Sequence, residues 1–223
     1  MKLPIEMVSD LVCPWCWVGL RRLKGAIELA PDLDVEVLFR PFELDPTIPA
    51  GGTDYKAYMK QRFGSDQSKD RANQMRDALI QYGKDEGIPF DFEKITRRPN
   101  SFNAHRLVRW AQGQNLGLAA KEALFEAYFS KGQDIGDHEV LVTIAAKIGL
   151  DANLVADLLA GDADVERTRQ EENLFRQMGI SGVPTFIAHR QIAVQGAETS
   201  EKLARFLKNA AAQTPAEQPM AGA

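Results

Sequence analysis

Two cysteines separated by two residues carry the most reactive chemistry in this sequence. Cys13 and Cys16 lie in the stretch VSDLVCPWCWVG near the N-terminus, and the chain of 223 residues has no other cysteine. Such a pair has three common uses: a structural cross-link, part of a metal site, or a dithiol that exchanges disulfides. The elements that position the two thiols decide among them.

The residues around the pair predict a strand that leads into a helix. Leu3 to Val8 alternates apolar and polar residues, whereas residues 15–30 carry apolar residues at helical spacing and end before Pro31. Pro14 suits the first helical turn, because its missing N–H has no helical partner there. We therefore expect Cys13 at the point where the strand ends and the helix begins.

That placement gives the two thiols different roles. At a helix start, residues i and i+3 lie on one face with Cα atoms roughly 5 Å apart, within the range that a disulfide requires. The free N–H groups and partial positive charge of the helix N-terminus favour the thiolate form of Cys13. Cys16 lies one turn further in, so it should keep its proton longer. The sequence predicts that Cys13 attacks or receives attack and that Cys16 resolves the mixed disulfide.

The other two uses are less consistent with the rest of the chain. A structural zinc site needs four ligands, but there is no third cysteine and the three histidines are scattered at 105, 138 and 189. We therefore expect no metal site. A chain of this length can bury a core without a cross-link, and structural disulfides are rare in a reducing cytosol.

Composition narrows the class of protein and of partner. The net charge is −4 and the sequence pI is about 5.5, which argues against a nucleic-acid partner. No apolar stretch approaches the ~18 residues of a membrane span, and the N-terminus lacks the features of a secretory signal. We expect a cytoplasmic protein without a membrane partner.

The order of predicted elements is β-α-β, a helical block, then β-β-α. The second strand covers residues 34–39, and a hairpin is predicted from residues 184–188 and 191–195, joined by His189 and Arg190. A last helix follows Thr199 and Ser200. We expect residues 1–45 and 179–211 to form one domain, residues 46–178 a helical insertion, and residues 212–223 a disordered tail.

The helical block is defined by apolar stripes that we expect to pack as core. Asp137 and Asp151 stand where helix N-caps belong. The stripes are Met75, Leu79 and Tyr82; Leu107, Trp110 and Ala111; and Val140, Ile144, Ala145 and Ile148.

Four stretches of the sequence resemble the thioredoxin superfamily, and within it the cytoplasmic DsbA-like group called FrnE-like. They are SDLVCPWCWVG, FRPFELDP (39–46), NSFNAHRL (100–107) and GISGVPTFIAHRQIAVQGA (179–197). The resemblance implies an α/β thioredoxin fold with an inserted all-helical domain. It also implies that the Val183–Pro184 bond is cis, faces the cysteines, and docks an extended substrate beside Cys13 as an added strand.

The resemblance draws attention to further residues. It implies that His105 lies near the active-site cleft, where it would contact substrate together with Asn100. Asp10 and Glu43 are candidates to shuttle a proton to Cys16, although a solvated or capping carboxylate is the commoner role of such residues.

Other residues near the pair have structural interpretations. We expect a solvated helix face at Arg21, Arg22 and Lys24; the alternative is that these charges steer acidic substrates. We expect Trp17 to pack in the core. Trp15 replaces the histidine that periplasmic DsbA proteins carry between their cysteines, and it offers no cation to Cys13, so we expect a less oxidising pair.

Three functional hypotheses follow. The first is a thiol–disulfide oxidoreductase acting on protein or small-molecule thiols and disulfides, with no bound cofactor and with glutathione as a candidate co-substrate. The second is a glutathione-dependent isomerase or transferase, resembling 2-hydroxychromene-2-carboxylate isomerase and kappa-class transferases, which are expected to use a single Ser or Cys. The third is a redox-sensing or chaperone-like binding protein. The sequence specifies neither the direction of electron flow nor the oligomeric state.

Overall fold

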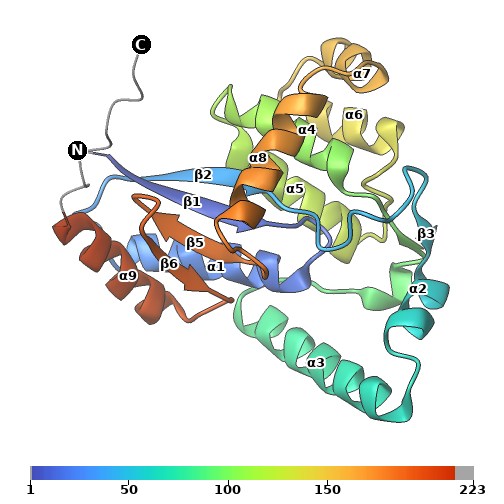
Figure 1. Ribbon diagram of the computed structural model, residues 1–223, viewed down its shortest axis with the longest axis horizontal. Helices are drawn as coiled ribbons and strands as arrows, with labels where there is room; N and C mark the ends of the chain where they lie inside the picture. The colour runs from blue at the N-terminus through green and yellow to red at the C-terminus, as the bar shows by residue number, and fades with distance from the viewer. Residues whose placement is uncertain (1, 214–223) are drawn as a thin grey trace.

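A four-stranded mixed sheet forms the centre of the protein, as the computed structural model in Figure 1 shows. The structure describes residues 2–213, apart from the side chains of residues 66–69. The strands are β1 (Leu3–Ser9), β2 (Val35–Pro41), β5 (Thr185–Ala188) and β6 (Ile192–Gln195), in the order β2-β1-β5-β6. β1 runs parallel to β2 and antiparallel to β5, so segments from both ends of the chain share one sheet.

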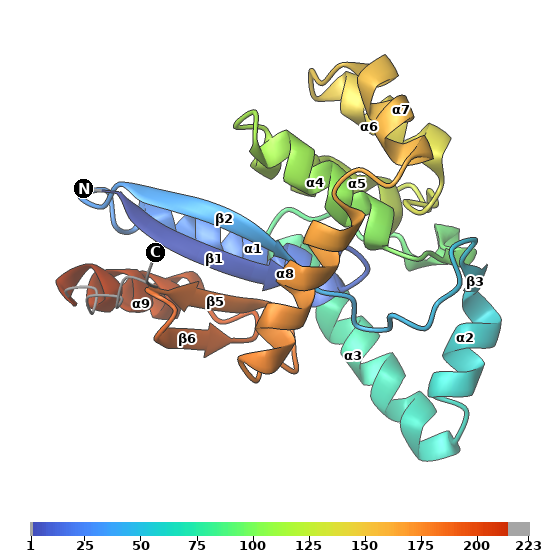
Figure 2. The same cartoon turned by 45° about the horizontal axis from the view of Figure 1, so that its top comes forward.

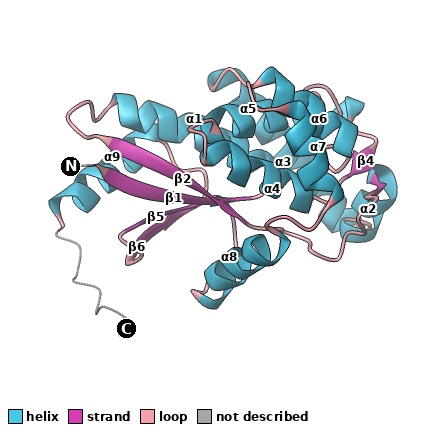
Figure 3. Ribbon diagram, turned by 90° about the horizontal axis from the view of Figure 1, so that it is seen from above, coloured by secondary structure: helices cyan, strands magenta, loops and turns pink. Residues whose placement is uncertain are grey.

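Helices cover both faces of this sheet. α1 (Pro14–Glu28) and α9 (Ser200–Ala212) pack together on one face, and α8 (Val165–Gln177) lies on the other (Figure 3). α1 buries Leu20, Leu23 and Ala26, which recur every three residues on the side toward the sheet. The strands of the predicted β-α-β and β-β-α halves therefore lie in one sheet.

In the described part of the chain, the helices other than α1 and α9 all lie within residues 46–178. They are α2 (Tyr55–Arg62), α3 (Asp66–Asp85), α4 (Phe102–Gln112), α5 (Gly117–Phe129), α6 (His138–Lys147), α7 (Ala152–Ala160) and α8, with a 3₁₀ turn at Phe92–Lys94. The prediction of helices alone missed a short antiparallel ladder between β3 (Thr53–Asp54) and β4 (Arg97–Arg98). Strands of two residues are too short to show an alternating pattern.

The predicted caps and most predicted core stripes are confirmed. The Asp137 and Asp151 side chains accept hydrogen bonds from backbone N–H groups in the first turns of α6 and α7. The stripe on α3 is wrong in part: Leu79 is buried, but Met75 is 40% and Tyr82 36% exposed. α3 projects from the body of the molecule (Figure 2), so only one side of it has a neighbour.

The predicted disordered tail falls mostly on residues 214–223, which lie outside the described part of the chain. Its predicted start at residue 212 is wrong by one residue, because Ala212 is the last residue of α9. The run of three alanines at the end of α9 favours the helix, which explains its extension.

Candidate active site

Cys13 and Cys16 occupy the first turn of α1, as their spacing predicts. Cys13 is the N-cap residue with an extended backbone, Pro14 is the first helical residue, and the Cys16 N–H donates to the Cys13 carbonyl at 3.0 Å. Both thiols are free. Cys13 retains 5% exposure and Cys16 has none, so only Cys13 reaches the edge of the surface.

The loop before β5 lies directly against Cys13. The Val183–Pro184 peptide bond is cis, and the Cys13 Sγ lies 3.8 Å from the Val183 carbonyl oxygen. Strand pairing produces this contact: Thr185 pairs with Val8 near the end of β1, and Cys13 follows β1 closely. Residues 170 positions apart are therefore neighbours because their strands are.

Gly19 in α1 makes the close approach of this loop possible. A Cβ atom at Gly19 would lie 2.8 Å from Cγ of Pro184 and 3.3 Å from Cζ of Phe186. Any larger side chain would therefore push the loop away from α1. The glycine is part of the packing that holds Pro184 beside the cysteine turn.

Asp10 ties the cysteine turn to two other segments. Its fully buried carboxylate accepts the N–H of Val12 at 3.3 Å, the N–H of Leu44 at 2.7 Å and the hydroxyl of Ser101 at 2.8 Å. These partners come from the turn itself, from the chain after β2, and from the start of α4. The carboxylate thus fixes the position of Cys13 relative to the helical segment.

Neighbouring groups keep the Asp10 carboxyl ionised. Burial alone would raise the pKa of its carboxyl, but the His105 ring, Arg98 and the Leu44 N–H outweigh burial and lower the pKa. His105 Nε2 lies 3.6 Å from Asp10 Oδ1, and Arg98 also donates to the Val12 carbonyl at 3.1 Å. Asp10 is therefore an anion beneath the cysteine turn, with the His105 ring beside it.

A buried lysine shares this environment with the Cys16 thiol. Burial and the neighbouring Cys13 raise the pKa of the Cys16 thiol well above its ordinary value, and Lys121 on α5 acts in the opposite direction. Lys121 is itself fully buried, which lowers its pKa to about 8 against the attraction of Cys16, Asp10 and Cys13. Charges of both signs therefore surround a thiol that has no contact with solvent.

Lys121, Ser101 and Arg98 were not predicted as site residues. The one available signal is the position of Lys121 among residues that belong to the core, since its neighbours Ala120 and Leu124 are also buried. A lysine on the apolar side of a helix is unusual enough to mark. Ser101 lies within the stretch NSFNAHRL but was not singled out there, and Arg98 carries no pattern that separates it from ordinary loop residues.

Asn100 and Glu43 lie in structural hydrogen-bond networks. Asn100 donates to the Ile48 carbonyl at 2.8 Å and accepts the Phe102 N–H at 3.0 Å, which shapes the loop before α4. The Glu43 carboxylate pairs with Arg169 of α8. No hydrogen bond or ion pair in the described chain connects either side chain with a cysteine.

The basic residues of α1 form ion pairs, which corrects the prediction of a solvated face. Arg22 is 2.7 Å from Glu86 and donates to the Ala197 carbonyl at 2.6 Å. Arg21 and Lys24 both pair with Glu122 of α5, at 3.5 and 2.8 Å. Sequence alone could not show that α3 and α5 place acidic residues opposite these positions.

The two tryptophans of the motif differ in environment. Trp17 is 1% exposed and stacks on Phe125 at 5.9 Å between ring centroids, which confirms its predicted packing role. Trp15 is partly exposed and makes an edge contact with Tyr82 at 5.6 Å. The indole of Trp15, between the two cysteines, is therefore paired with Tyr82 of α3.

The structure offers no grouping for a metal ion within residues 2–213: no three His, Cys, Asp or Glu side chains come together there. Among the helices described, none combines the length and apolar character of a membrane span.

A match to a family model decides the classification. Residues 4–208 match the DsbA-like thioredoxin domain. The chain belongs to this family. A probable DsbA oxidoreductase of Streptomyces coelicolor has a TM-score of 0.86 and 30% identity, covering 99% of this chain and 95% of its own. The uncharacterized protein YwbO of Bacillus subtilis is 28% identical over 84% of this chain and 87% of its own length.

Solved structures of lower sequence identity share the fold. A 2-hydroxychromene-2-carboxylate isomerase has a TM-score of 0.68 and 18% identity over 94% of both chains. The cytosolic disulfide reductase DsbM of Pseudomonas aeruginosa, in a structure with glutathione, has a TM-score of 0.63 and 18% identity over 93% of this chain and 98% of its own. The family-model match confirms the DsbA-like thioredoxin resemblance that the sequence predicts.

Proposed function

We propose that this protein is a cytoplasmic thiol–disulfide oxidoreductase of the FrnE-like type in which Cys13 is the nucleophile and Cys16 the resolving thiol. One observation carries the proposal. Cys13 caps α1 at the surface edge beside Val183, whereas Cys16 lies fully buried one turn behind it. A substrate sulfur can therefore meet Cys13 first, and Cys16 can reach only Cys13.

The Val183–Pro184 loop is proposed to dock the substrate. Val183 precedes β5, and its carbonyl already faces the Cys13 sulfur. An extended peptide or glutathione could hydrogen-bond to this segment as an added strand while its sulfur contacts Cys13. Proposed substrates are protein or small-molecule thiols and disulfides, and glutathione is a candidate because DsbM was solved with it. The two sulfurs carry the electrons, so the exchange needs no bound cofactor.

Trapping the intermediate tests this assignment. Cys16→Ser incubated with a disulfide substrate should accumulate one substrate thiol on Cys13, detected as a mass increase that a reductant reverses. Cys13→Ser is the matched control and should accumulate none, because Cys16 is buried. Failure of Cys16→Ser to form the adduct would contradict the mechanism.

A second candidate function is a glutathione-dependent isomerase, favoured by the fold shared with 2-hydroxychromene-2-carboxylate isomerase. That activity would use Cys13 with bound glutathione and would not need Cys16. Full turnover of a small organic substrate by Cys16→Ser with glutathione would favour it.

A further inference from the structure

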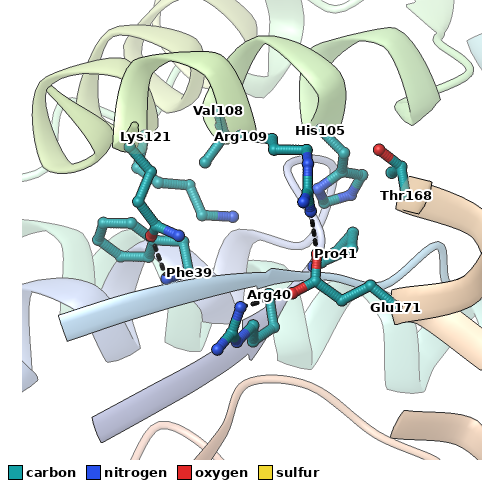
Figure 4. A pocket seen from close by; sticks show the side chains of 10 residues that line it. Phe39, Arg40, Pro41, His105, Val108, Arg109, Lys121, Thr168 and Glu171 are labelled. Atoms are coloured by element: carbon teal, nitrogen blue, oxygen red, sulfur yellow. Dashed lines mark hydrogen bonds and ion pairs between the residues drawn. The ribbon is translucent and has the colours of Figure 1, made fainter. Parts of the chain in front are cut away.

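A narrow pocket lies beside strand β2, between that strand, helices α4 and α5 above it, and helix α8 at one side (Figure 4). Phe39 and Pro41 of β2 form its floor, and Val108 of α4 contributes an apolar wall. β1 stands between β2 and β5 in the sheet, so the pocket and the Val183–Pro184 loop are on opposite sides of the strand that leads to Cys13. The pocket is therefore distinct from the proposed docking site.

Three buried polar atoms that line this pocket have no hydrogen-bond partner among the described residues. They are His105 Nε2, Lys121 Nζ and Thr168 Oγ1, on residues that are 4%, 0% and 1% exposed. Buried polar groups are nearly always paired with protein or with ordered water, and an unpaired buried ammonium is costly. Three such atoms around one space indicate that the space is suited to water.

The inner end of the pocket adjoins the active site. His105, on its wall, lies 3.6 Å from the Asp10 carboxylate that holds the cysteine turn. Lys121 is within electrostatic reach of both Cys16 and Asp10. Lys121 and His105 thus link the surroundings of the buried thiol with the pocket that they line, and together with it they form a polar path.

The outer end is framed by charged side chains. Glu171 of α8 pairs with Arg109 of α4 at 2.7 Å and with Arg40 of β2 at 2.5 Å, and all three line the pocket (Figure 4). Their side chains are 18–25% exposed, so they stand between the pocket and solvent. The polar path thus reaches the surface.

We propose that this pocket is the proton exit of Cys16, and that Lys121 and His105 relay the proton between the buried thiol and water. The inference deepens the proposed function and rests on it. The inserted helical segment, which supplies both residues, would then take part in the chemistry of the thioredoxin-like unit.

The relay acts when Cys16 resolves the mixed disulfide. The Cys16 S–H gives its proton to the relay, and the resulting thiolate attacks the Cys13 sulfur of the mixed disulfide. The Cys13–Cys16 bond forms as the bond between Cys13 and the substrate sulfur breaks. The substrate leaves as a thiolate and takes a proton from water, while the relay returns its proton to solvent. The cysteine pair is oxidised by two electrons and the substrate is reduced.

Lys121 has properties that suit the relay. With a pKa of about 8, roughly one-tenth of it is neutral at pH 7 and able to accept a proton. Efficient proton transfer needs a group whose pKa is near the working pH. The charged and titratable groups that face it are Cys16, Asp10 and Cys13 on the inner side. His105, Arg40, Arg109 and Glu171 share its pocket.

A two-phase assay separates this step from the first attack. Reduced protein is mixed with a bis(nitrobenzoate) disulfide, which releases one coloured thiolate when Cys13 attacks and a second when Cys16 resolves. Lys121→Met should leave the first phase within about twofold and slow the second about a hundredfold at pH 7. His105→Gln should slow the second phase in the same way.

The pH profile supplies a readout that a merely structural role would not move. In the wild type the second phase should accelerate toward pH 8 and then level off, whereas in Lys121→Met it should keep rising with hydroxide concentration. Lys147→Met, the same change at an exposed position on α6, is the control and should match the wild type.

The outcomes separate the two proposals. If the second phase of Lys121→Met is as fast as that of the wild type across pH 6–9, the relay is overturned, but the proposed oxidoreductase function still stands. Absence of a second phase in the wild type contradicts the function itself. If Lys121→Met does not fold, two other measurements test the relay. The relay is overturned if the rate of the second phase in the wild type does not level off near pH 8 and the second phase of His105→Gln is as fast as in the wild type.

Discussion

The Cys13 sulfur lies 3.8 Å from the Val183 carbonyl oxygen, although 170 residues separate them in sequence. The two positions meet because β1, which precedes Cys13, pairs with β5, which follows Val183. Cys13 is thereby placed beside the backbone segment that we propose docks an extended substrate. The predictions below test what holds this arrangement and what it does.

Replacing Gly19 should disturb the docking loop. Gly19→Ala would place a Cβ 2.8 Å from Pro184, so the loop or α1 must shift. Helical Gly→Ala changes usually stabilise, but this one should cost about 1–3 kcal/mol and slow the reaction of Cys13 with disulfides. Urea denaturation and single-turnover kinetics measure the two effects. Gly113→Ala, whose Cβ would come no closer than 3.4 Å to its nearest neighbour, is the control; equal effects of both would contradict the packing account.

Trp15 should tune the redox potential of the pair. Trp15→His would place a titratable cation beside Cys13 and stabilise its thiolate, which favours the reduced form. We expect the reduction potential to become less negative by about 30 mV or more, which corresponds to about 1.4 kcal/mol. Equilibration with glutathione followed by thiol quantification measures it. An unchanged or more negative reduction potential would show that the residue at position 15 does not set the reduction potential of the cysteine pair.

Trp17 should matter for folding rather than for exchange. It is 1% exposed and packs among Phe90, Phe125 and Phe129. Trp17→Ala should lower the free energy of unfolding by about 3–5 kcal/mol, while Trp17→Phe should cost less because it keeps a ring in place. Chemical denaturation gives both values. A small loss of stability together with a large loss of substrate binding would instead make Trp17 part of the substrate surface.

Glu43 should make stability depend on pH. Burial raises its pKa from 4.5 to about 7, with Glu172 adding to the rise and Arg169 opposing it. A raised folded-state pKa means that its contribution is present below pH 4.5 and is lost as the pH rises through about 7. Glu43→Gln mimics the protonated form. The free energy of unfolding of this variant, relative to that of the wild type, should therefore rise by at least about 1 kcal/mol from pH 5 to pH 8.

The control for this prediction is Glu139→Gln, the same change at an exposed position on α6. Denaturation curves at both pH values are compared for the three proteins. A pH-independent difference between Glu43→Gln and the wild type would contradict the buried, raised-pKa description of Glu43.

The elements that carry the site could be predicted because their signals are local. The alternation of Leu3–Val8, the apolar spacing after Trp15 and the hairpin after Pro184 each lie within a few residues. The placement of Cys13 at a strand-to-helix turn follows from these signals alone. That the two ends of the chain share a sheet followed once they were recognised as halves of one unit.

What could not be predicted depends on contacts between distant helices. Lys121 is buried because α5 packs against α1, and Arg22 is paired because Glu86, the residue after α3, lies opposite it. The pairing of Glu43 depends likewise on α8 lying across the sheet. Single-sequence periodicity carries no information on which helix faces which, so the charged interior of the site emerged only from the structure.

Titration of the wild-type protein against mixtures of reduced and oxidised glutathione tests the central claim most directly. The account predicts one two-electron transition in which both thiols disappear together, and mass spectrometry of the product shows an intramolecular Cys13–Cys16 disulfide two hydrogens lighter than the reduced chain. A product that stops at a single glutathione on Cys13, or thiols that persist in the most oxidising mixture, would contradict a working dithiol.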